Sequence, residues 1–211
     1  RQIDRAQPDL TPGEKYLRTL EHLGSSSLIS DVSQYTLNNL QKSYAQLDQG
    51  TVEQIVDILL SSDRKYIAGF RGTACCAQYM ASKLLFLTPH VVPILHADAT
   101  AVENLLDITE RDCLFLYSFP RYSEIARPLM EIARESGAKV ILMTDRRTSP
   151  LANKADVVVT AQVDGLGFTN SYVAPLSLSE VILLSVSGRR DVTDSKRFNR
   201  IDSVMDREKL Y

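Results

Sequence analysis

The sequence predicts an α/β fold: a five-stranded parallel sheet of flavodoxin-like order flanked by helices. Five short apolar runs alternate with stretches long enough for helices. Each run is hydrophobic almost throughout rather than at every second position, which is typical of strands buried on both faces. The runs cover residues 65–70, 91–95, 113–117, 139–143 and 156–160. Strands that alternate with helices in this way form parallel sheets with right-handed crossovers.

The order of the strands follows from Pro93 in the second run. Proline has no N–H to donate to a neighbouring strand, so we expect this strand at an edge of the sheet. An edge position for the second strand fits the order 2-1-3-4-5. In that order the winding reverses between strands 1 and 3, and ligands bind in the crevice at the carboxyl ends of those two strands. The turns after the first and third runs, residues 69–74 and 118–124, are therefore expected to face one crevice.

Helical patterns precede and follow the sheet region. Thr11 and Glu14 predict the start of the first helix, because they form a capping box around a proline at the first helical position. Apolar residues at helical spacing predict further helices up to residue 60, after the first and third apolar runs, over residues 174–186 and near the end of the chain. We expect an N-terminal helical segment, a sheet domain and a C-terminal helical tail, at residues 1–50, 51–188 and 189–211.

Composition and charge limit what the chain can do. Its 211 residues suit one α/β domain with additions, and the apolar fraction of 44% is ordinary for a globular protein. A net charge of −2 without a long block of one sign gives no electrostatic basis for direct binding to nucleic acid. No apolar stretch approaches the roughly 20 residues that cross a bilayer, and no leader is visible, so we expect a cytoplasmic protein. The chain begins with Arg1 rather than Met, which indicates a piece of a longer protein or a processed one.

The cysteines predict neither a disulfide framework nor a metal site. Cys75, Cys76 and Cys113 are odd in number and lack the spacing of metal ligands. We interpret them as reduced thiols of the core. The sequence also lacks a nucleophile elbow and a histidine-rich cluster. Hydrolytic, metal and redox chemistry are therefore not expected, and neither is a cofactor.

The first crevice loop, residues 69–74, runs directly from a strand into a helix. Glycines let the backbone turn sharply there, and Thr73 can cap the helix. Free N–H groups at the start of a helix favour negative charge. Neither the dinucleotide-binding fingerprint nor the phosphate-loop sequence is present. The loop therefore predicts an anion site of another kind.

The second crevice loop, residues 118–124, offers hydrogen-bond donors of several kinds. Ser118 and Ser123 carry hydroxyls, Arg121 carries a guanidinium, and a second helix is expected to begin at Ser123. A phosphate is bound well by several donors together with one planar guanidinium. Each residue alone also has a purely structural interpretation, as a helix cap or a solvent-exposed side chain. Their meeting at the expected crevice favours a ligand site.

At these loops the chain resembles a known family. Residues from about 51 to 187 are similar to a sugar isomerase (SIS) domain, and specifically to the C-terminal effector domain of RpiR/MurR-type bacterial transcriptional regulators. The most telling segment is Ser149-Pro150-Leu151-Ala152, which leads into a short apolar run. The other segments that carry the resemblance are residues 69–73, 118–123, 137–141 and 144–145.

The resemblance implies a site with altered contacts. In that family the first loop commonly ends in serine, and the second carries a phosphate cradle rich in serine and threonine, with a glycine. Thr73, Ser118 and Ser123 stand at the matching hydroxyl positions, whereas Arg71 replaces a usual glycine and Pro120-Arg121 replaces a usual Ser-Gly. The candidate ligand contacts are therefore Arg71, Gly72, Thr73, Ser118, Arg121, Ser123 and His96.

An isomerase of this fold would also need a base to move a proton between adjacent carbons. His96 follows the second strand on the correct side of the sheet and is either a ligand contact or a loop residue, whereas His22 and His90 are expected elsewhere. Glu180 lies in an apolar helical segment, where it is either such a base or a carboxylate at a packing contact. Two further carboxylates follow strands and either contact a sugar hydroxyl or cap a turn: Asp98 and Asp145.

The resemblance implies a domain that senses a phosphorylated sugar or a similar small anion for a bacterial transcriptional regulator. DNA would be bound by a helix-turn-helix domain upstream of Arg1, which is not in this sequence. A phosphosugar isomerase of the same fold is the alternative, and a module that only dimerises is a third. The amphipathic N-terminal helices and the apolar helix over residues 174–186 exceed what the two faces of one sheet need. We therefore expect at least a dimer, in which a neighbouring subunit helps to close each crevice.

Overall fold

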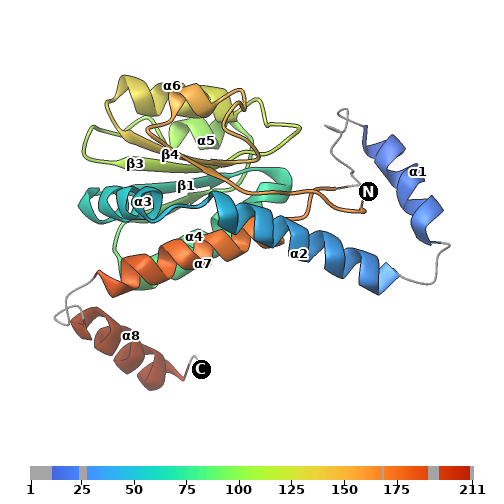
Figure 1. Ribbon diagram of the computed structural model, residues 1–211. Helices are drawn as coiled ribbons and strands as arrows, with labels where there is room; N and C mark the ends of the chain where they lie inside the picture. The colour runs from blue at the N-terminus through green and yellow to red at the C-terminus, as the bar shows by residue number, and fades with distance from the viewer. Residues whose placement is uncertain (1–10, 24–27, 168, 190–194, 210–211) are drawn as a thin grey trace.

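The computed structural model describes residues 11–23, 28–167, 169–189 and 195–209. At its centre is a five-stranded sheet in which every strand pair is parallel (Figure 1). The strands are, in chain order, β1 (Lys65–Gly69), β2 (Val91–Ile94), β3 (Cys113–Tyr117), β4 (Lys139–Thr144) and β5 (Val157–Thr160). The order across the sheet is β2-β1-β3-β4-β5, which confirms the predicted fold class and strand order.

Helices flank the sheet and extend beyond it. In chain order they are α1 (Pro12–Leu23), α2 (Leu28–Gln46), α3 (Gln49–Ser61), α4 (Ala74–Leu87), α5 (Ala99–Glu103), α6 (Ala126–Glu135), α7 (Val173–Gly188) and α8 (Ser195–Glu208). Helix α5 was not anticipated, because five residues are too few for an apolar period to be recognised. Among the described residues, every helix is too short or too polar to cross a membrane.

Helix starts follow the local chemistry of their first residues. The Thr11 N–H donates to Glu14 Oε2 at 2.7 Å, and the Glu14 N–H donates to Thr11 Oγ1 at 3.3 Å. This reciprocal pair confirms the predicted capping box of α1. At α3, Asp48 Oδ1 accepts the Thr51 N–H at 2.8 Å. Each cap supplies an acceptor to N–H groups that have no partner inside the helix.

Strand β2 lies at an edge of the sheet, as Pro93 predicts. Pro93 is exposed and sits opposite Ile67 of β1, and β2 has one strand neighbour where β1 and β3 have two. All residues of β1 and β3 are buried. A missing N–H at the open side of an edge strand costs no hydrogen bond of the sheet. The first and third strands are therefore central, and their ends form the switch point.

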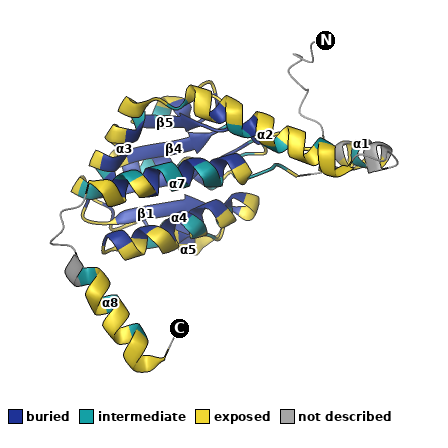
Figure 2. Ribbon diagram, turned by 60° about the horizontal axis from the view of Figure 1, so that its bottom comes forward, coloured by how far each residue is buried: buried dark blue, intermediate teal, exposed yellow. Residues whose placement is uncertain are grey.

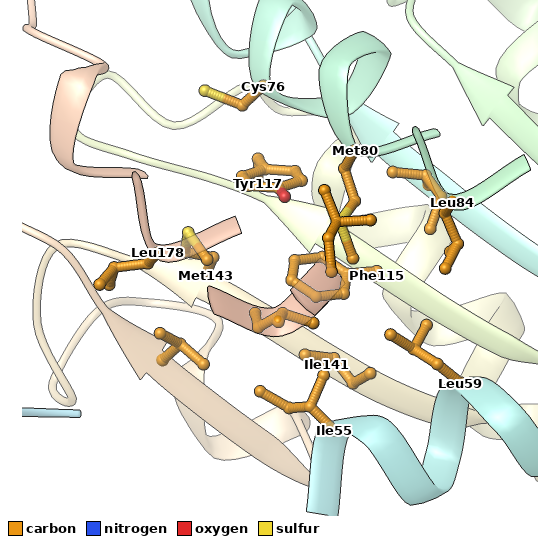
Figure 3. Packing of buried hydrophobic residues seen from close by; sticks show 14 of the residues in the cluster. Ile55, Leu59, Cys76, Met80, Leu84, Phe115, Tyr117, Ile141, Met143 and Leu178 are labelled. Carbon is orange, nitrogen blue, oxygen red and sulfur yellow. The ribbon is translucent and has the colours of Figure 1, made fainter. Parts of the chain in front are cut away.

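The sheet is covered on both faces, which gives three layers (Figure 1). Alternate strand residues point to opposite faces: Phe115 and Tyr117 of β3 face α3, α4 and α7, whereas Leu114 and Leu116 face α5 and α6. Figure 3 shows the first of these cores, in which aliphatic side chains of α3 and α4 surround the two β3 aromatic rings. The rings of Phe115 and Tyr117 stack with centroids 5.0 Å apart. This core fixes the carboxyl end of β3, where the second crevice loop begins.

The C-terminal half of α2 packs on the body of the protein, whereas its N-terminal half and α1 extend away from the sheet (Figures 1 and 2). Asn39 of α2 donates to the Asp164 carbonyl oxygen at 2.6 Å, and the Gln46 side chain accepts a hydrogen bond from Thr160 at 2.6 Å. Several apolar side chains of the extension are exposed, among them Leu17 at 60% and Ile29 at 87%. Within the described chain, this apolar face is largely uncovered.

Candidate anion-binding site

A crevice of about 560 Å³ lies at the carboxyl ends of β1 and β3. Three segments line it, from residues 70–73, 117–123 and 169–172. The first two are the loops that the strand order predicts at this place. The volume lies within the range of roughly 300–1,000 Å³ that is usual for small-molecule sites.

The first loop is a tight turn held by its own hydrogen bonds. A side chain at Gly69 would place a Cβ atom 2.6 Å from the Thr73 carbonyl oxygen, so only glycine fits. The Phe70 N–H donates to Thr73 Oγ1 at 2.8 Å, and this hydroxyl donates to the Phe70 carbonyl oxygen at 2.9 Å. Thr73 lines the crevice, but its hydroxyl bonds within the loop. It does not cap α4, although the sequence had predicted that it could.

Ser118 is the most informative residue of the second loop. The residue is 4% exposed and lines the crevice, and its hydroxyl has no hydrogen-bond partner among the described residues. Leaving a buried hydroxyl unpaired costs about 1–3 kcal/mol. Its backbone N–H is satisfied by the Met143 carbonyl oxygen at 3.0 Å, so the hydroxyl alone remains available. A ligand that accepts a hydrogen bond from it would remove this cost.

Ser123 lies in a turn and not at the start of a helix. Helix α6 begins at Ala126, three residues later than the sequence indicated. The Ala126 N–H donates to the Ser123 carbonyl oxygen at 3.0 Å, so the backbone closes a turn before the helix starts. Ser123 is partly exposed and lines the crevice. The expected helix start was wrong because a turn and the first helical turn carry the same serine signal.

Arg71 and Arg121 share an unusual backbone conformation. Their φ angles are +56° and +66°, in the left-handed region that favours glycine. This conformation costs a residue with a Cβ atom about 1–2 kcal/mol. Both arginines line the crevice and are exposed. In the described part of the chain neither guanidinium forms a hydrogen bond or an ion pair.

A hydrogen bond ties the second loop to the end of β4. The Tyr122 hydroxyl donates to Asp145 Oδ1 at 2.7 Å. Asp145 also accepts a hydrogen bond from Thr144 at 3.1 Å and pairs with Arg146 at 3.4 Å. Its side chain is 14% exposed. Of its two interpretations from sequence, the structure shows Asp145 holding a turn in place.

Residues 169–172 form a third wall that sequence reasoning missed. A Cβ atom at Gly72 would lie 2.7 Å from the Tyr172 hydroxyl, so glycine permits this close approach. The Tyr172 ring packs edge-on against Phe119 at 6.1 Å between centroids, and Asn170 donates to the Pro120 carbonyl oxygen at 3.4 Å. Burial raises the pKa of the Tyr172 hydroxyl, which favours its neutral form. An aromatic residue just before an apolar helix was the available signal.

Other candidates lie outside the crevice. His96 follows β2, is exposed and does not line the crevice. Glu180 pairs with Lys83 at 3.2 Å between α7 and α4, as a surface carboxylate. His90 precedes β2 at the opposite end of the sheet, and His22 falls on α1. The roles of the seven candidate ligand contacts, His96 included, stay predictions.

The buried groups beneath the crevice are held neutral. The Tyr117 hydroxyl bonds to Ser179 Oγ at 2.7 Å, and burial raises the pKa of Tyr117. Burial likewise raises the pKa of the Cys76 thiol near the start of α4. The lining residues in the described part of the chain comprise two guanidiniums and no carboxylate. The described residues hold no cluster of metal-ligand side chains. The crevice is therefore electropositive, over a neutral floor.

A family model described as the SIS domain matches residues 58–185, which is more than half of the chain. The chain belongs to the SIS domain family. This confirms the resemblance inferred from the two loops and from the segments that follow them in the sequence. A search of curated protein sequences found no match.

Solved structures of other SIS domains share the fold. The sugar isomerase domain of an RpiR transcription factor from Sphaerobacter thermophilus superposes with a TM-score of 0.81 at 21% identity, over 84% of this chain and 99% of that one. The Vibrio vulnificus NanR protein complexed with ManNAc-6P gives 0.72 at 15% identity, over 88% and 71%. A Methanococcus jannaschii protein with an inferred 3-hexulose-6-phosphate isomerase function gives 0.64 at 15%, over 82% and 96%. At these identities the likeness establishes the fold.

Proposed function

We propose that this SIS domain binds a phosphorylated sugar and serves as the ligand-sensing domain of a bacterial transcriptional regulator. The observation that carries the proposal is the hydroxyl of Ser118, which is buried in the lining of an electropositive crevice and has no partner among the described residues. A phosphate oxygen accepts hydrogen bonds and carries negative charge, and both properties match this crevice.

The second loop supplies donors of the kinds that one phosphate group needs. Ser118 and Ser123 contribute hydroxyls, and Arg121 contributes a planar guanidinium. The remaining volume is lined by Phe119, Tyr172 and other side chains with apolar surface. A sugar ring presents hydroxyls and apolar C–H faces, and it suits such a wall. NanR, a protein of similar fold, binds ManNAc-6P.

Sensing is favoured over isomerisation by the chemistry of the lining residues. Proton transfer between adjacent carbons requires a base within hydrogen-bond reach. The lining residues in the described part of the chain include neither a carboxylate nor an imidazole. The isomerase remains the second candidate because the Methanococcus jannaschii protein has the same fold. The RpiR and NanR domains superpose with higher TM-scores.

DNA binding belongs to another part of the full regulator in this proposal. The chain carries a net charge of −2, and its charged residues form no long block of one sign. Direct affinity for DNA depends strongly on clustered positive charge. A helix-turn-helix domain in the same reading frame would supply it. The SIS domain would transmit the state of its ligand to that domain, as a homodimer.

Calorimetric titration together with a turnover assay tests the proposal. The purified chain is titrated with fructose 6-phosphate, glucose 6-phosphate, ManNAc-6P, inorganic phosphate and unphosphorylated fructose. We expect at least one phosphosugar to bind more tightly than inorganic phosphate, and fructose not to bind. Each ligand that binds is then incubated with the chain and followed by NMR. Conversion of an aldose to a ketose phosphate would establish the isomerase, and the absence of all binding would refute both functions.

A further inference from the structure

The phosphate site proposed above takes its donors from the second loop and leaves Arg71 without an assigned role. Arg121, Ser118 and Ser123 all belong to the second loop and together match one phosphate group. Arg71 belongs to the first loop, which follows β1. It nevertheless lines the same crevice, with an exposed side chain.

In the first loop, the guanidinium of Arg71 is the main group that remains available to a ligand. The hydroxyl of Thr73 is committed to the Phe70 backbone in both directions, as donor and as acceptor. The Tyr172 ring lies against Gly72 and covers that side of the loop. In the described part of the chain, no carboxylate pairs with Arg71. The guanidinium is therefore available to a group on the ligand.

The charges around the crevice are not balanced by the protein. Arg71 and Arg121 line one crevice of about 560 Å³, and none of the other lining residues in the described ranges is acidic. Both arginines adopt a left-handed backbone conformation that favours glycine, with φ angles of +56° and +66°. Two unpaired cations that face one cavity repel each other, and a ligand with matching anionic groups removes that repulsion.

We propose that the ligand of this SIS domain carries a second anionic group beside its phosphate, and that Arg71 selects for that group. The second group is a carboxylate or a second phosphate, because a guanidinium binds either through two parallel hydrogen bonds. The proposal rests on phosphosugar binding as the proposed function. The competing arrangement is one phosphate clamped by both arginines.

Matched ligand pairs separate the two arrangements. Fructose 6-phosphate is compared with fructose 1,6-bisphosphate, and glucose 6-phosphate with 6-phosphogluconate, by calorimetric titration. We expect the parent chain to bind the doubly anionic member of one pair at least about tenfold more tightly than its partner. The pair that shows this preference identifies the second group as phosphate or carboxylate.

Variants assign the preference to Arg71. Arg71→Gly suits the positive φ angle, so it removes the guanidinium without adding backbone strain. We expect it to abolish the preference, by weakening binding of the doubly anionic member much more than binding of the singly phosphorylated member. Arg121→Gly should weaken both members by about tenfold or more. His90→Gly, at φ +58° near the opposite end of the sheet, is the matched control and should change neither affinity.

Three outcomes would overturn the proposal. Equal affinity of the parent chain for both members of both pairs would refute the proposal that the ligand carries a second anionic group. An equal loss of affinity for both members in Arg71→Gly would show one phosphate held by both arginines. If the chain binds singly and doubly anionic sugars equally well, the proposed function stands and only the second anionic group is refuted. If the chain binds no phosphosugar, the proposed function and this proposal are both refuted.

Discussion

The Tyr122 hydroxyl donates a hydrogen bond to Asp145 Oδ1 at 2.7 Å, and this bond joins the second crevice loop to the end of β4. Tyr122 lies between Arg121 and Ser123, which are two of the donors of this loop that line the crevice. The bond therefore holds the loop in place next to Arg121, whose backbone is in the left-handed region. A preorganised loop loses less conformational entropy when it binds a ligand.

Tyr122→Phe should weaken ligand binding more than it weakens the fold. Loss of one hydrogen bond should lower the free energy of unfolding by about 1 kcal/mol, because Asp145 keeps its bonds to Thr144 and Arg146. A looser loop should lower phosphosugar affinity several-fold in a calorimetric titration. Tyr44→Phe is the control: it removes a hydroxyl of α2 that bonds to Ser177 of α7 at 2.8 Å, and it should leave affinity unchanged.

Ser118→Ala should stabilise the free chain and weaken the complex. The substitution removes a buried hydroxyl without a partner, so we expect the free energy of unfolding to rise by about 1 kcal/mol. Binding of a phosphosugar should fall about tenfold, as one hydrogen bond to a charged group is lost. Urea denaturation and titration of the same sample measure both effects.

Ser149→Ala is the matched control for that experiment. Ser149 is the other buried serine whose hydroxyl lacks a partner in the described residues, and it does not line the crevice. This variant should gain a similar stability and keep its affinity. Equal losses of affinity in both variants would show that the Ser118 hydroxyl makes no specific contact with the ligand.

Arg121→Gly should raise stability while it lowers affinity. Glycine adopts the φ angle of +66° without the cost of about 1–2 kcal/mol that a Cβ atom carries there. The greater freedom of glycine in the unfolded chain offsets part of this gain, so we expect a net increase of about 0.5–1 kcal/mol. His90→Gly should show the same increase in a urea titration without any loss of affinity. A lower free energy of unfolding in Arg121→Gly would contradict the claim that the φ angle of Arg121 strains the backbone.

Stability should fall at alkaline pH because buried thiols must stay protonated. Burial raises the pKa of Cys113 from 9.0 to about 11. A raised pKa in the folded state means that this contribution is complete below about pH 9 and is lost as the pH rises toward 11, by about 1.4 kcal/mol per pH unit. Burial shifts the pKa of Cys76 and of Tyr117 in the same direction. Denaturation of Cys113→Ala should show a weaker pH dependence between about pH 9 and 11 than denaturation of the parent chain.

The apolar face of α1 and α2 should hold two copies of the chain together. Leu17 is 60% exposed and Ile29 is 87% exposed, on helices that extend away from the sheet. Sedimentation at micromolar concentration should give at least a dimer, and Ile29→Lys should shift it toward monomer. Leu106→Glu, on a surface residue that is 65% exposed, is the control and should leave association unchanged. A monomeric parent chain would contradict the expectation.

The strands and their order were predictable because a strand that is buried on both faces has a nearly continuous run of apolar residues. Each of the five apolar runs became a strand within one residue at either end. Pro93 was sufficient to place β2 at an edge, since its missing N–H is a local property with a consequence for the whole sheet. Two of the three walls of the crevice followed from that order.

The third wall was not predictable, because it depends on packing between distant segments. Tyr172 lies against Gly72, and nothing in either local sequence specifies the other. The left-handed backbone of Arg71 and Arg121 was also hidden, because arginine seldom adopts it and the sequence shows no glycine there. The internal bonding of Thr73 depends on loop geometry that a capping rule does not describe.

A crystal structure of the chain with a bound phosphosugar tests the central claim most directly. We expect the phosphate at the carboxyl ends of β1 and β3, with an oxygen at about 2.5–3.0 Å from Ser118 Oγ and the Arg121 guanidinium turned toward it. A phosphate bound elsewhere, with the Ser118 hydroxyl still unpartnered, would contradict the claim.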